Sequence, residues 1–177
     1  MKVLIAYASK TGTAASCAER LESELRGVDV TLADLEKEAP ELDAYDVVVL
    51  GSSVRFGKTR ASFQAYLKSN REALLQKEHG FFLCCGFGHE FERYEKKAID
   101  EGLRETAFAS MTFGGLFKLP NASFWERFLL RQVRAEIRES EIEDGEYTPT
   151  LPSILPENIS MMASKIRRAL AEIKEKD

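Results

Sequence analysis

Five short stretches of the chain are rich in apolar residues, and each is separated from the next by a longer stretch of mixed character. The short stretches are 3–7, 28–32, 46–50, 81–85 and 109–117. Their length and their content of branched and aromatic residues are typical of β-strands. Where the apolar run is nearly continuous, the strand is expected to be buried on both faces of a sheet. The pattern therefore predicts five strands.

In the stretches between them, apolar residues recur at every third or fourth position, which is the period of an amphipathic helix. The residues that fit the four predicted helical stripes are Ala14, Ala18, Leu21 and Leu25; Phe63, Tyr66, Leu67, Asn70 and Leu74; Phe91, Tyr94, Ala98 and Leu103; and Ile159, Met162, Ile166, Leu170 and Ile173. Gly27 suits the end of the first helix. Residues 35–43 form a connector rich in acidic side chains.

Strands and helices alternate along the chain, which predicts an α/β fold with a parallel sheet and helices on both faces. Residues 118–156 interrupt the alternation. A connection of this length in a compact domain is usually functional or disordered. Since 177 residues is a typical single-domain length, we expect one domain over 1–177 with an insertion at 118–156.

The composition is that of an average soluble domain, with 44% hydrophobic and 31% charged residues. No apolar run approaches the roughly 20 residues of a membrane-spanning helix. Residues 1–5 lead directly into a strand and lack the features of a secretory signal, so we expect a cytoplasmic protein. The net charge of −4 argues against general binding of nucleic acid.

The three cysteines, Cys17, Cys84 and Cys85, are odd in number and form no CxxC motif, which argues against a disulfide framework. Together with His79 and His89, they show none of the spacings of a zinc site. We therefore expect no metal.

The loop at residues 9–14, between the first strand and the first helix, has the composition of a phosphate site. Ligands of open parallel sheets bind at the carboxyl ends of strands, and Ser9, Thr11 and Thr13 offer hydroxyls there. Gly12 permits a tight turn that exposes backbone N–H groups, and the start of the helix adds its positive dipole end. The alternative is that these residues only cap the helix.

Two other glycine-containing segments are similar to nucleotide motifs without matching them. Residues 51–59 have five residues between their glycines where a P-loop has four, and they follow the third strand instead of the first. Residues 86–91 begin as a dinucleotide fingerprint does, but Phe91 replaces its third glycine. Neither segment predicts a nucleotide site.

Taken together, these features resemble the flavodoxin family, whose phosphate loop reads Ser/Thr-x-Thr-Gly-x-Thr after the first strand. Ser9, Thr11 and Gly12 match that loop, whereas Ala14 replaces its last threonine and leaves Thr13 as a substitute. The resemblance implies a flavodoxin-like, doubly wound sheet of five parallel strands in the order 2-1-3-4-5. It also implies FMN, bound non-covalently at the ends of strands one, three and four.

Within that family, the chain is similar to the menaquinone-dependent protoporphyrinogen IX dehydrogenases. The similarity is carried by segments 51–57 and 61–64 after the third strand, and by 115–120 and 124–128 after the fifth. It covers most of the chain and weakens after Arg134 and in the loop after the fourth strand. It implies an enzyme that passes electrons from a porphyrinogen through FMN to a quinone.

The resemblance further implies that three loops hold the cofactor. These loops contain Ser9, Lys10, Thr11, Gly12, Thr13 and Ala14; Ser52, Ser53, Val54, Arg55, Phe56 and Gly57; and Cys85, Gly86, Phe87, Gly88 and His89. Arg55 is the predicted catalytic residue, because a cation near the ring favours a reduced, anionic flavin; the alternative is an ordinary surface arginine. Cys84 or Cys85 could have a redox role, or could be a buried thiol without one. His89 could transfer a proton near the ring, or could be an ordinary solvated histidine.

Residues 124–134 predict a helix with an apolar side that includes Phe124, Trp125 and Phe128, and with three arginines in a band opposite. Such a helix can lie on an anionic membrane surface or bind an acidic partner. Alternatively, it packs against its own sheet and exposes the arginines. Peripheral membrane contact would suit a reaction with a quinone.

Three functions are open on the sequence. The first is an FMN oxidoreductase that acts on a porphyrinogen and a quinone, which Arg55 and the insertion favour. The second is an electron carrier without a substrate of its own, which the acidic charge and the small size favour. The third is a partner-binding module that has lost FMN, which Ala14 keeps open.

Overall fold

The computed structural model describes residues 1–86, 88–115 and 153–176, and a five-stranded parallel sheet forms its centre. The strands lie in the order β2-β1-β3-β4-β5, as the family resemblance implies. They are β1 Lys2–Ala8, β2 Asp29–Asp34, β3 Val47–Ser53, β4 Glu78–Cys84 and β5 Ala109–Thr112. The chain runs from β1 to β2 on one side and returns to β3 on the other, so the strand order reverses beside β1.

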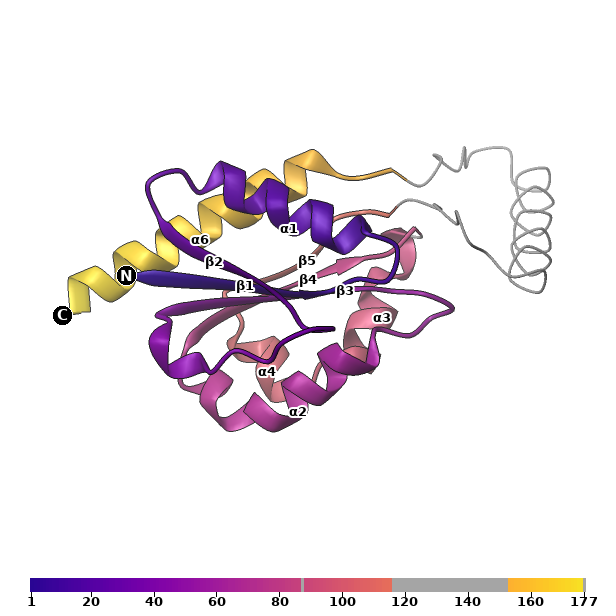
Figure 1. Cartoon of the computed structure of the whole chain (residues 1–177), viewed down its shortest axis with the longest axis horizontal. Helices are drawn as coiled ribbons and strands as arrows, with labels where there is room; N and C mark the ends of the chain where they lie inside the picture. Colours follow the sequence, from indigo (N-terminus) through magenta and orange to yellow (C-terminus); the bar gives the residue numbers. More distant parts are fainter. Residues whose placement is uncertain (87, 116–152, 177) are drawn as a thin grey trace.

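Helices cover both faces of the sheet, which gives three layers (Figure 1). Helices α1 (Thr13–Glu24) and α6 (Pro156–Lys176) lie on one face. Helices α2 (Ala61–Leu75), α3 (Phe91–Ala98) and α4 (Glu101–Thr106) lie on the other. Two short 3₁₀ turns, η1 (Leu42–Ala44) and η2 (Gly88–Glu90), complete the described elements.

The apolar strands are buried on both sides, which explains their nearly continuous hydrophobic runs. Successive side chains of a strand point to opposite faces. In β1, Val3 and Ile5 therefore join the core under α1 and α6, whereas Leu4 and Ala6 join the core under α2. The helical stripe of α6 is confirmed in the same way, since Ile159, Met162 and Ile166 are fully buried.

The predicted helix with the stripe Phe91, Tyr94, Ala98 and Leu103 is wrong, because the chain forms two helices there. Ile99 adopts an extended conformation with φ −121° and ψ 128°, and α3 ends before it. Its side chain is only 2% exposed in the core beneath α2. Leu103 belongs to α4. Its spacing from the residues of α3 matches a helical period only by coincidence.

The fifth strand is shorter than the predicted 109–117. It ends at Thr112, and Gly114 then adopts a left-handed φ of 74°. Gly114 forms an isolated antiparallel bridge with Ile154, supported by hydrogen bonds from Gly115 N to Ser153 O (3.1 Å) and from Leu155 N to Phe113 O (3.0 Å). The two flanks of the segment 116–152, which lies outside the described residues, are therefore paired to each other.

Strand β4 begins at Glu78, three residues before the predicted start, because the polar His79 and the small Gly80 hide it from a search for apolar runs. His79 is fully buried, and its ring nitrogens lie 2.8 Å from Lys77 O and 2.9 Å from Leu103 O. The imidazole thus links β4 to α4. Within the described ranges, no cluster of His, Cys, Asp and Glu could hold a metal ion.

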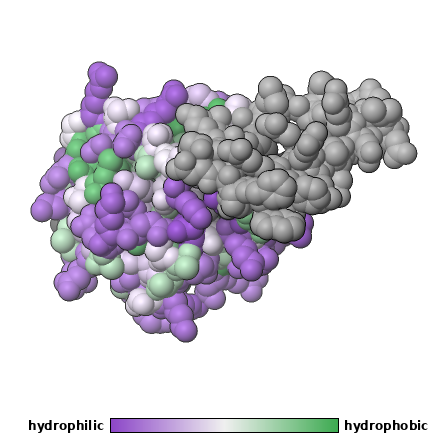
Figure 2. Space-filling model, turned by 45° about the vertical axis from the view of Figure 1, so that its right-hand side comes forward, coloured by the Kyte–Doolittle hydropathy of each residue, from purple (hydrophilic) through white to green (hydrophobic). Residues whose placement is uncertain are grey.

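The face of the molecule in Figure 2 carries mainly hydrophilic side chains over its described part. None of the described helices is both long enough and apolar enough to cross a bilayer. A single domain over 1–177 with an insertion at 118–156 stays a prediction, because most of that insertion lies outside the described residues.

Candidate functional site

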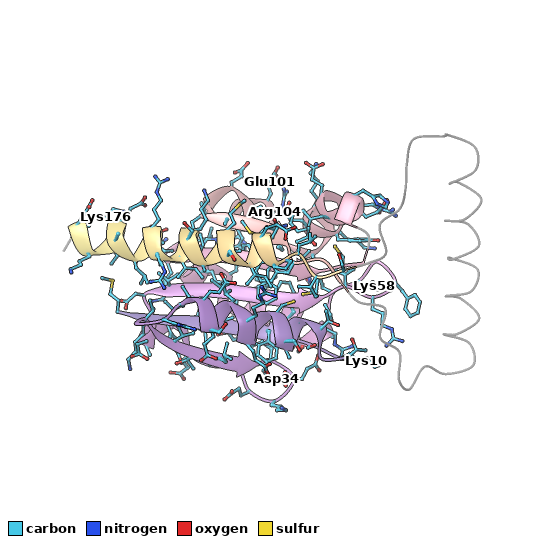
Figure 3. The ribbon with its side chains drawn as sticks, turned by 90° about the horizontal axis from the view of Figure 1, so that it is seen from above. Lys10, Asp34, Lys58, Glu101, Arg104 and Lys176 are labelled. Atoms are coloured by element: carbon cyan, nitrogen blue, oxygen red, sulfur yellow. The ribbon has the colours of Figure 1, made fainter. Side chains whose placement is uncertain are left out.

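The carboxyl ends of β1, β3 and β4 meet at one edge of the sheet, because the three strands are parallel and adjacent. The predicted cofactor loops follow these strands directly. In Figure 3, Lys10 of the first loop and Lys58 of the second lie towards the same end of the molecule, whereas Lys176 lies at the opposite end. The fold thus places the three loops at the switch point of the sheet, where α/β folds bind ligands.

The loop after β1 has unsatisfied hydrogen-bonding groups at the start of a helix. Gly12 is the N-cap of α1 with φ 84°, and no side chain of the described residues caps that helix. The hydroxyl oxygens of Ser9 and Thr13 are buried and have no hydrogen-bond partner within the described ranges. Buried hydroxyls without partners are rare. Together with the exposed N–H groups of a helix start, they suit a bound anion such as a phosphate monoester.

The alternative in which Ser or Thr only caps this helix is not supported, because Gly12 occupies the cap. Ala14, where the family has threonine, is fully buried in the core between α1 and the sheet. Its side chain therefore faces away from the loop, and its backbone N–H is the group it could offer to a ligand. Lys10 is exposed and Thr11 half-buried at the rim.

The loop after β3 forms a tight hairpin at residues 55–58. Arg55 N donates to Lys58 O at 2.9 Å, and Lys58 N donates to Arg55 O at 3.1 Å. Between them, Phe56 has φ 49° and Gly57 has φ 69°, the positive pair of a type I′ turn. Glycine adopts this conformation freely, whereas a left-handed conformation costs other residues about 1–2 kcal/mol. Phe56 is 57% exposed, and the Arg55 guanidinium lies 5.4 Å from its ring centroid.

The base of this loop is fixed by internal hydrogen bonds. Ser52 is fully buried, and its hydroxyl accepts from Arg60 N at 3.0 Å and donates to Ser53 O at 3.1 Å. Val54 N donates to Cys84 O at 2.9 Å and so joins the loop to the end of β4. Ser52 and Val54 therefore shape the loop, while Ser53 lies half-buried between them.

The loop after β4 begins with a buried thiol. Cys85 is 2% exposed, and its Sγ lies 3.3 Å from Thr112 Oγ1. Burial raises the pKa of Cys85 above its usual value, although the contact with Thr112 lowers it in part. Gly86 is half-buried, and a side chain added at Gly115 would lie 2.6 Å from Gly86 N. The chain after β5 thus packs directly against this loop.

Two later residues of this loop are exposed to solvent. Gly88 and His89 are exposed in η2, whereas Phe87 lies outside the described residues. Of the predicted loop residues, the structure thus brings Cys85 and Gly86 beneath the site and Gly88 and His89 to its outer rim.

Cys84 is buried like Cys85, and it is the member of the pair that joins the core under α1 and α6. It shares the core under α1 with Cys17, and the two thiols are hydrogen-bonded to each other. This hydrogen bond and complete burial raise the pKa of Cys84 well above its usual value. Buried, protonated thiols are poor nucleophiles, so a covalent role for Cys84 is not supported.

Tyr94 is a residue at the site that the sequence indicated only as part of a helical stripe. A side chain added at Gly57 would lie 3.7 Å from its Cε1, so α3 packs against the hairpin at residues 55–58 through this ring. Burial raises the pKa of the Tyr94 phenol, and Glu90 and Cys85 raise it further. The ring therefore lies between the second and third loops. An aromatic residue on the predicted helix shortly after the third loop was the available signal.

The sequence family model of the flavodoxin domain matches residues 4–143 of this chain. The chain belongs to the flavodoxin family. A relative within it, protoporphyrinogen IX dehydrogenase [quinone] of Escherichia coli strain K12, is 32% identical over 143 residues. The match covers 75% of this flavodoxin-family chain and 78% of the relative.

Solved structures show the same fold. Oxidised flavodoxin 2 from Bacillus cereus is 24% identical, with a TM-score of 0.52, over 78% of this chain and 99% of its own. Rubredoxin oxygen:oxidoreductase from Desulfovibrio gigas is 19% identical, with a TM-score of 0.52, over 78% of this chain and 35% of its own. Membership of the flavodoxin family implies binding of a flavin, and the relative from Escherichia coli indicates an oxidoreductase.

Proposed function

We propose that this protein is an FMN-dependent oxidoreductase that transfers electrons from a porphyrinogen to a quinone. The observation that carries the cofactor assignment is the uncapped start of α1 with the unpartnered, buried hydroxyls of Ser9 and Thr13 within the described ranges. The substrates are inferred from the name of the relative that shares 32% of its residues over most of this chain.

The first loop would hold the phosphate of FMN. Ser9 and Thr13 would donate hydrogen bonds, and the tight turn at Gly12 would let backbone N–H groups approach the phosphate oxygens. Thr13 would replace the family threonine that is absent at Ala14. Nothing in this loop requires a second phosphate, so FMN is favoured over FAD.

The other two loops would flank the ring. FMN, when bound, supplies two-electron redox chemistry. The half-buried Arg55 would bring its positive charge near the ring and would favour its reduced, anionic form. Residues 52–57 and 85–89 would lie along the ring and limit its contact with water. Arg55 is thus the proposed catalytic residue, and its role is electrostatic.

A simple electron carrier is the second candidate. Its support is that oxidised flavodoxin 2 aligns with this chain over 99% of its own length. The flavodoxin fold is thus complete without an insertion. The extra segment at 118–156 and Arg55 beside the ring instead favour an enzyme. We further propose a cytoplasmic protein, with residues 124–134 making peripheral contact with the membrane that holds the quinone. Those residues lie outside the described part of the chain.

Reconstitution and turnover test the proposal. The apoprotein is incubated with FMN or FAD and passed through a gel-filtration column, and we expect it to retain FMN only. The FMN-loaded protein is then supplied with protoporphyrinogen IX and a menaquinone analogue without oxygen, and we expect porphyrin and quinol to form. Retention of FMN without turnover would favour the carrier, and retention of neither flavin would favour the partner-binding module.

A further inference from the structure

Thr112, the last residue of β5, connects three parts of the chain. Its hydroxyl oxygen accepts a hydrogen bond from Gly114 N at 3.0 Å and lies 3.3 Å from Cys85 Sγ. Its backbone oxygen accepts a hydrogen bond from Asn158 Nδ2, in the first turn of α6, at 2.8 Å. One residue thus contacts the chain on both sides of segment 116–152 and the third cofactor loop.

The two flanks of that segment form a neck, by which we mean residues 113–115 and 153–155, and the neck packs closely against the third loop. A Cβ added at Gly115 would lie 2.6 Å from Gly86 N and 2.7 Å from the carbonyl carbon of Cys85. Both are backbone atoms, which cannot move aside as the end of a flexible side chain can. Gly115 has no left-handed φ, so glycine is required there by the close approach of two backbones.

The hydroxyl of Thr112 anchors the base of the third loop. A hydroxyl has one donor and two lone pairs, so it can accept from Gly114 N and still share a hydrogen bond with the thiol of Cys85. Beyond this contact the loop soon loses its burial, since Gly86 is half-buried and Gly88 is exposed. A segment with little burial of its own opens easily, and its conformation depends on the anchors at its base.

Ser110 offers a comparison on the same strand. Side chains two residues apart in a strand point to the same face, so Ser110 and Thr112 share one face of β5. The hydroxyl oxygen of Ser110 is buried and has no hydrogen-bond partner within the described ranges. Both positions thus carry a hydroxyl, but the contacts with the neck and with the third loop are made by Thr112.

We infer that Thr112 is a positioning residue for the flavin, which holds the third cofactor loop through Cys85 and ties that loop to the neck. The inference rests on the proposed function, in which the third loop would flank the flavin ring. It extends that function, because a shift of the neck would change the surroundings of the ring.

Removal of the hydroxyl tests the inference on the full chain. Thr112→Val keeps the shape of the side chain, whereas Thr112→Ser keeps the hydroxyl. We expect Thr112→Val to weaken FMN binding about tenfold in a fluorescence titration and to change the visible circular dichroism of the bound flavin. Thr112→Ser should behave as wild type does in both measurements. Ser110→Ala is the matched control and should change neither.

Thiol labelling separates a local effect on the loop from a general loss of stability. The apoprotein of each variant is labelled with N-ethylmaleimide, and peptide mass spectrometry gives separate rates for Cys85 and Cys17. Cys17 is 2% exposed in the core under α1, so its rate reports opening of that core. We expect Thr112→Val to raise the rate at Cys85 about tenfold more than the rate at Cys17.

A second variant acts from the neck and keeps the hydroxyl. Gly115→Ala should displace the third loop, because the added methyl group would overlap the backbone of Cys85 and Gly86. We expect it to weaken FMN binding and to change the visible circular dichroism as Thr112→Val does. Gly102→Ala on α4 is its control, since the nearest atoms to an added Cβ there are the ends of side chains at 3.3 Å. That variant should leave both measurements unchanged.

The outcomes distinguish this inference from the proposed function. The inference is overturned if wild type retains FMN and Thr112→Val binds it equally well, if Thr112→Ser resembles Thr112→Val, or if the labelling rates of Cys85 and Cys17 rise together. Should Thr112→Val not fold, unchanged FMN affinity in Gly115→Ala overturns it. If wild type itself binds no FMN, the proposed function fails, and the inference fails with it.

Discussion

At the scale of single residues, we expect Arg55 to influence how readily the proposed flavin is reduced. We expect Arg55→Glu to lower the two-electron potential, because the change removes an attraction for negative charge on the reduced ring and adds a repulsion. Two charges about 4 Å apart interact by about 4 kcal/mol at an effective dielectric of 20. Solvent reduces that value at a half-buried site, and about 30 mV corresponds to 1.4 kcal/mol for a two-electron couple. A redox titration should therefore show a fall of some tens of millivolts.

The control for Arg55→Glu is Lys165→Glu, which makes the same change of charge sign on α6. Its potential should equal that of wild type. A potential that stays constant or rises in Arg55→Glu would place the guanidinium away from the ring, and the carrier would then be the better assignment.

Gly12 is the residue on which the phosphate loop depends most. We expect Gly12→Val to abolish FMN binding, because a β-branched side chain resists the left-handed φ of 84° and crowds the phosphate. The structure offers a matched control at the other end of α1. Gly27 has φ 81°, and like Gly12 it has nothing within 4 Å of an added Cβ.

Both glycine variants should therefore lose a similar part of the free energy of unfolding, about 1–2 kcal/mol. Only Gly12→Val should lose FMN in a fluorescence titration. Equal FMN affinity in the two variants would show that the phosphate is held elsewhere.

Tyr66 should make the fold sensitive to alkaline pH. Burial raises the pKa of Tyr66 to about 12, and its hydroxyl donates a hydrogen bond to Pro40 O. In the unfolded chain this phenol ionises near its ordinary pKa of 10.0. The stability that the neutral phenol provides is thus complete below pH 10 and is lost as the pH rises towards 12, by about 1.4 kcal/mol per pH unit.

Denaturant unfolding at a series of pH values measures this effect. Below pH 10, Tyr66→Phe should be less stable than wild type by about 1 kcal/mol, because it lacks the hydrogen bond. Its free energy of unfolding should nevertheless fall less steeply than that of wild type above pH 10. Parallel curves for the two proteins would contradict the assignment.

At the scale of elements, the sequence predicted best those helices that have one long apolar stripe. Helices α1, α2 and α6 were predicted because their buried residues follow a single helical period. The period could not reveal the extended Ile99, since Ile99 itself is buried and the stripe continues beyond it. The start of β4 was missed for a different reason. His79 is a polar residue, and the sequence does not show that it is buried with its ring nitrogens close to backbone carbonyls.

The predicted helix at residues 124–134 is the element whose role is most separable from the cofactor. We expect a variant with both Trp125→Ser and Phe128→Ser to bind FMN as wild type does, because these residues follow β5 and lie outside the three flavin loops. Turnover with the quinone and sedimentation with anionic vesicles should both decrease. Loss of FMN with intact circular dichroism would instead place this segment at the cofactor.

At the scale of the whole molecule, the arrangement of the site follows from the order of the strands. The alternation of strands and helices predicted a parallel sheet, and the family resemblance supplied the order that brings the ends of β1, β3 and β4 together. The conformations within the loops could not be predicted. A left-handed phenylalanine at position 56 contradicts its own propensity, and the engaged hydroxyl of Ser52 depends on Arg60, eight residues away.

FMN should stabilise the whole fold, because the three loops of the proposed site come together only in the folded chain. At a free concentration of one hundred times its Kd, a ligand of the native state adds about 2.7 kcal/mol. For a chain of this size, that corresponds to a rise in melting temperature of about 5–10 °C. Thermal unfolding with increasing FMN should show this rise in wild type and not in Gly12→Val. A wild-type melting temperature independent of FMN would contradict the proposed site.

The pairing of Gly114 with Ile154 has a consequence for how this protein could have diversified. Because the two flanks of residues 116–152 are hydrogen-bonded to each other, the two ends of this segment, at Gly115 and Ser153, lie side by side. A loop closed at its base can change length with little penalty, since doubling it costs only about 0.6 kcal/mol of closure entropy. We therefore expect the segment to be exchangeable. A chimera that receives the corresponding segment of a relative, or a two-residue turn, should keep the sheet and its cofactor loops while acquiring or losing a substrate.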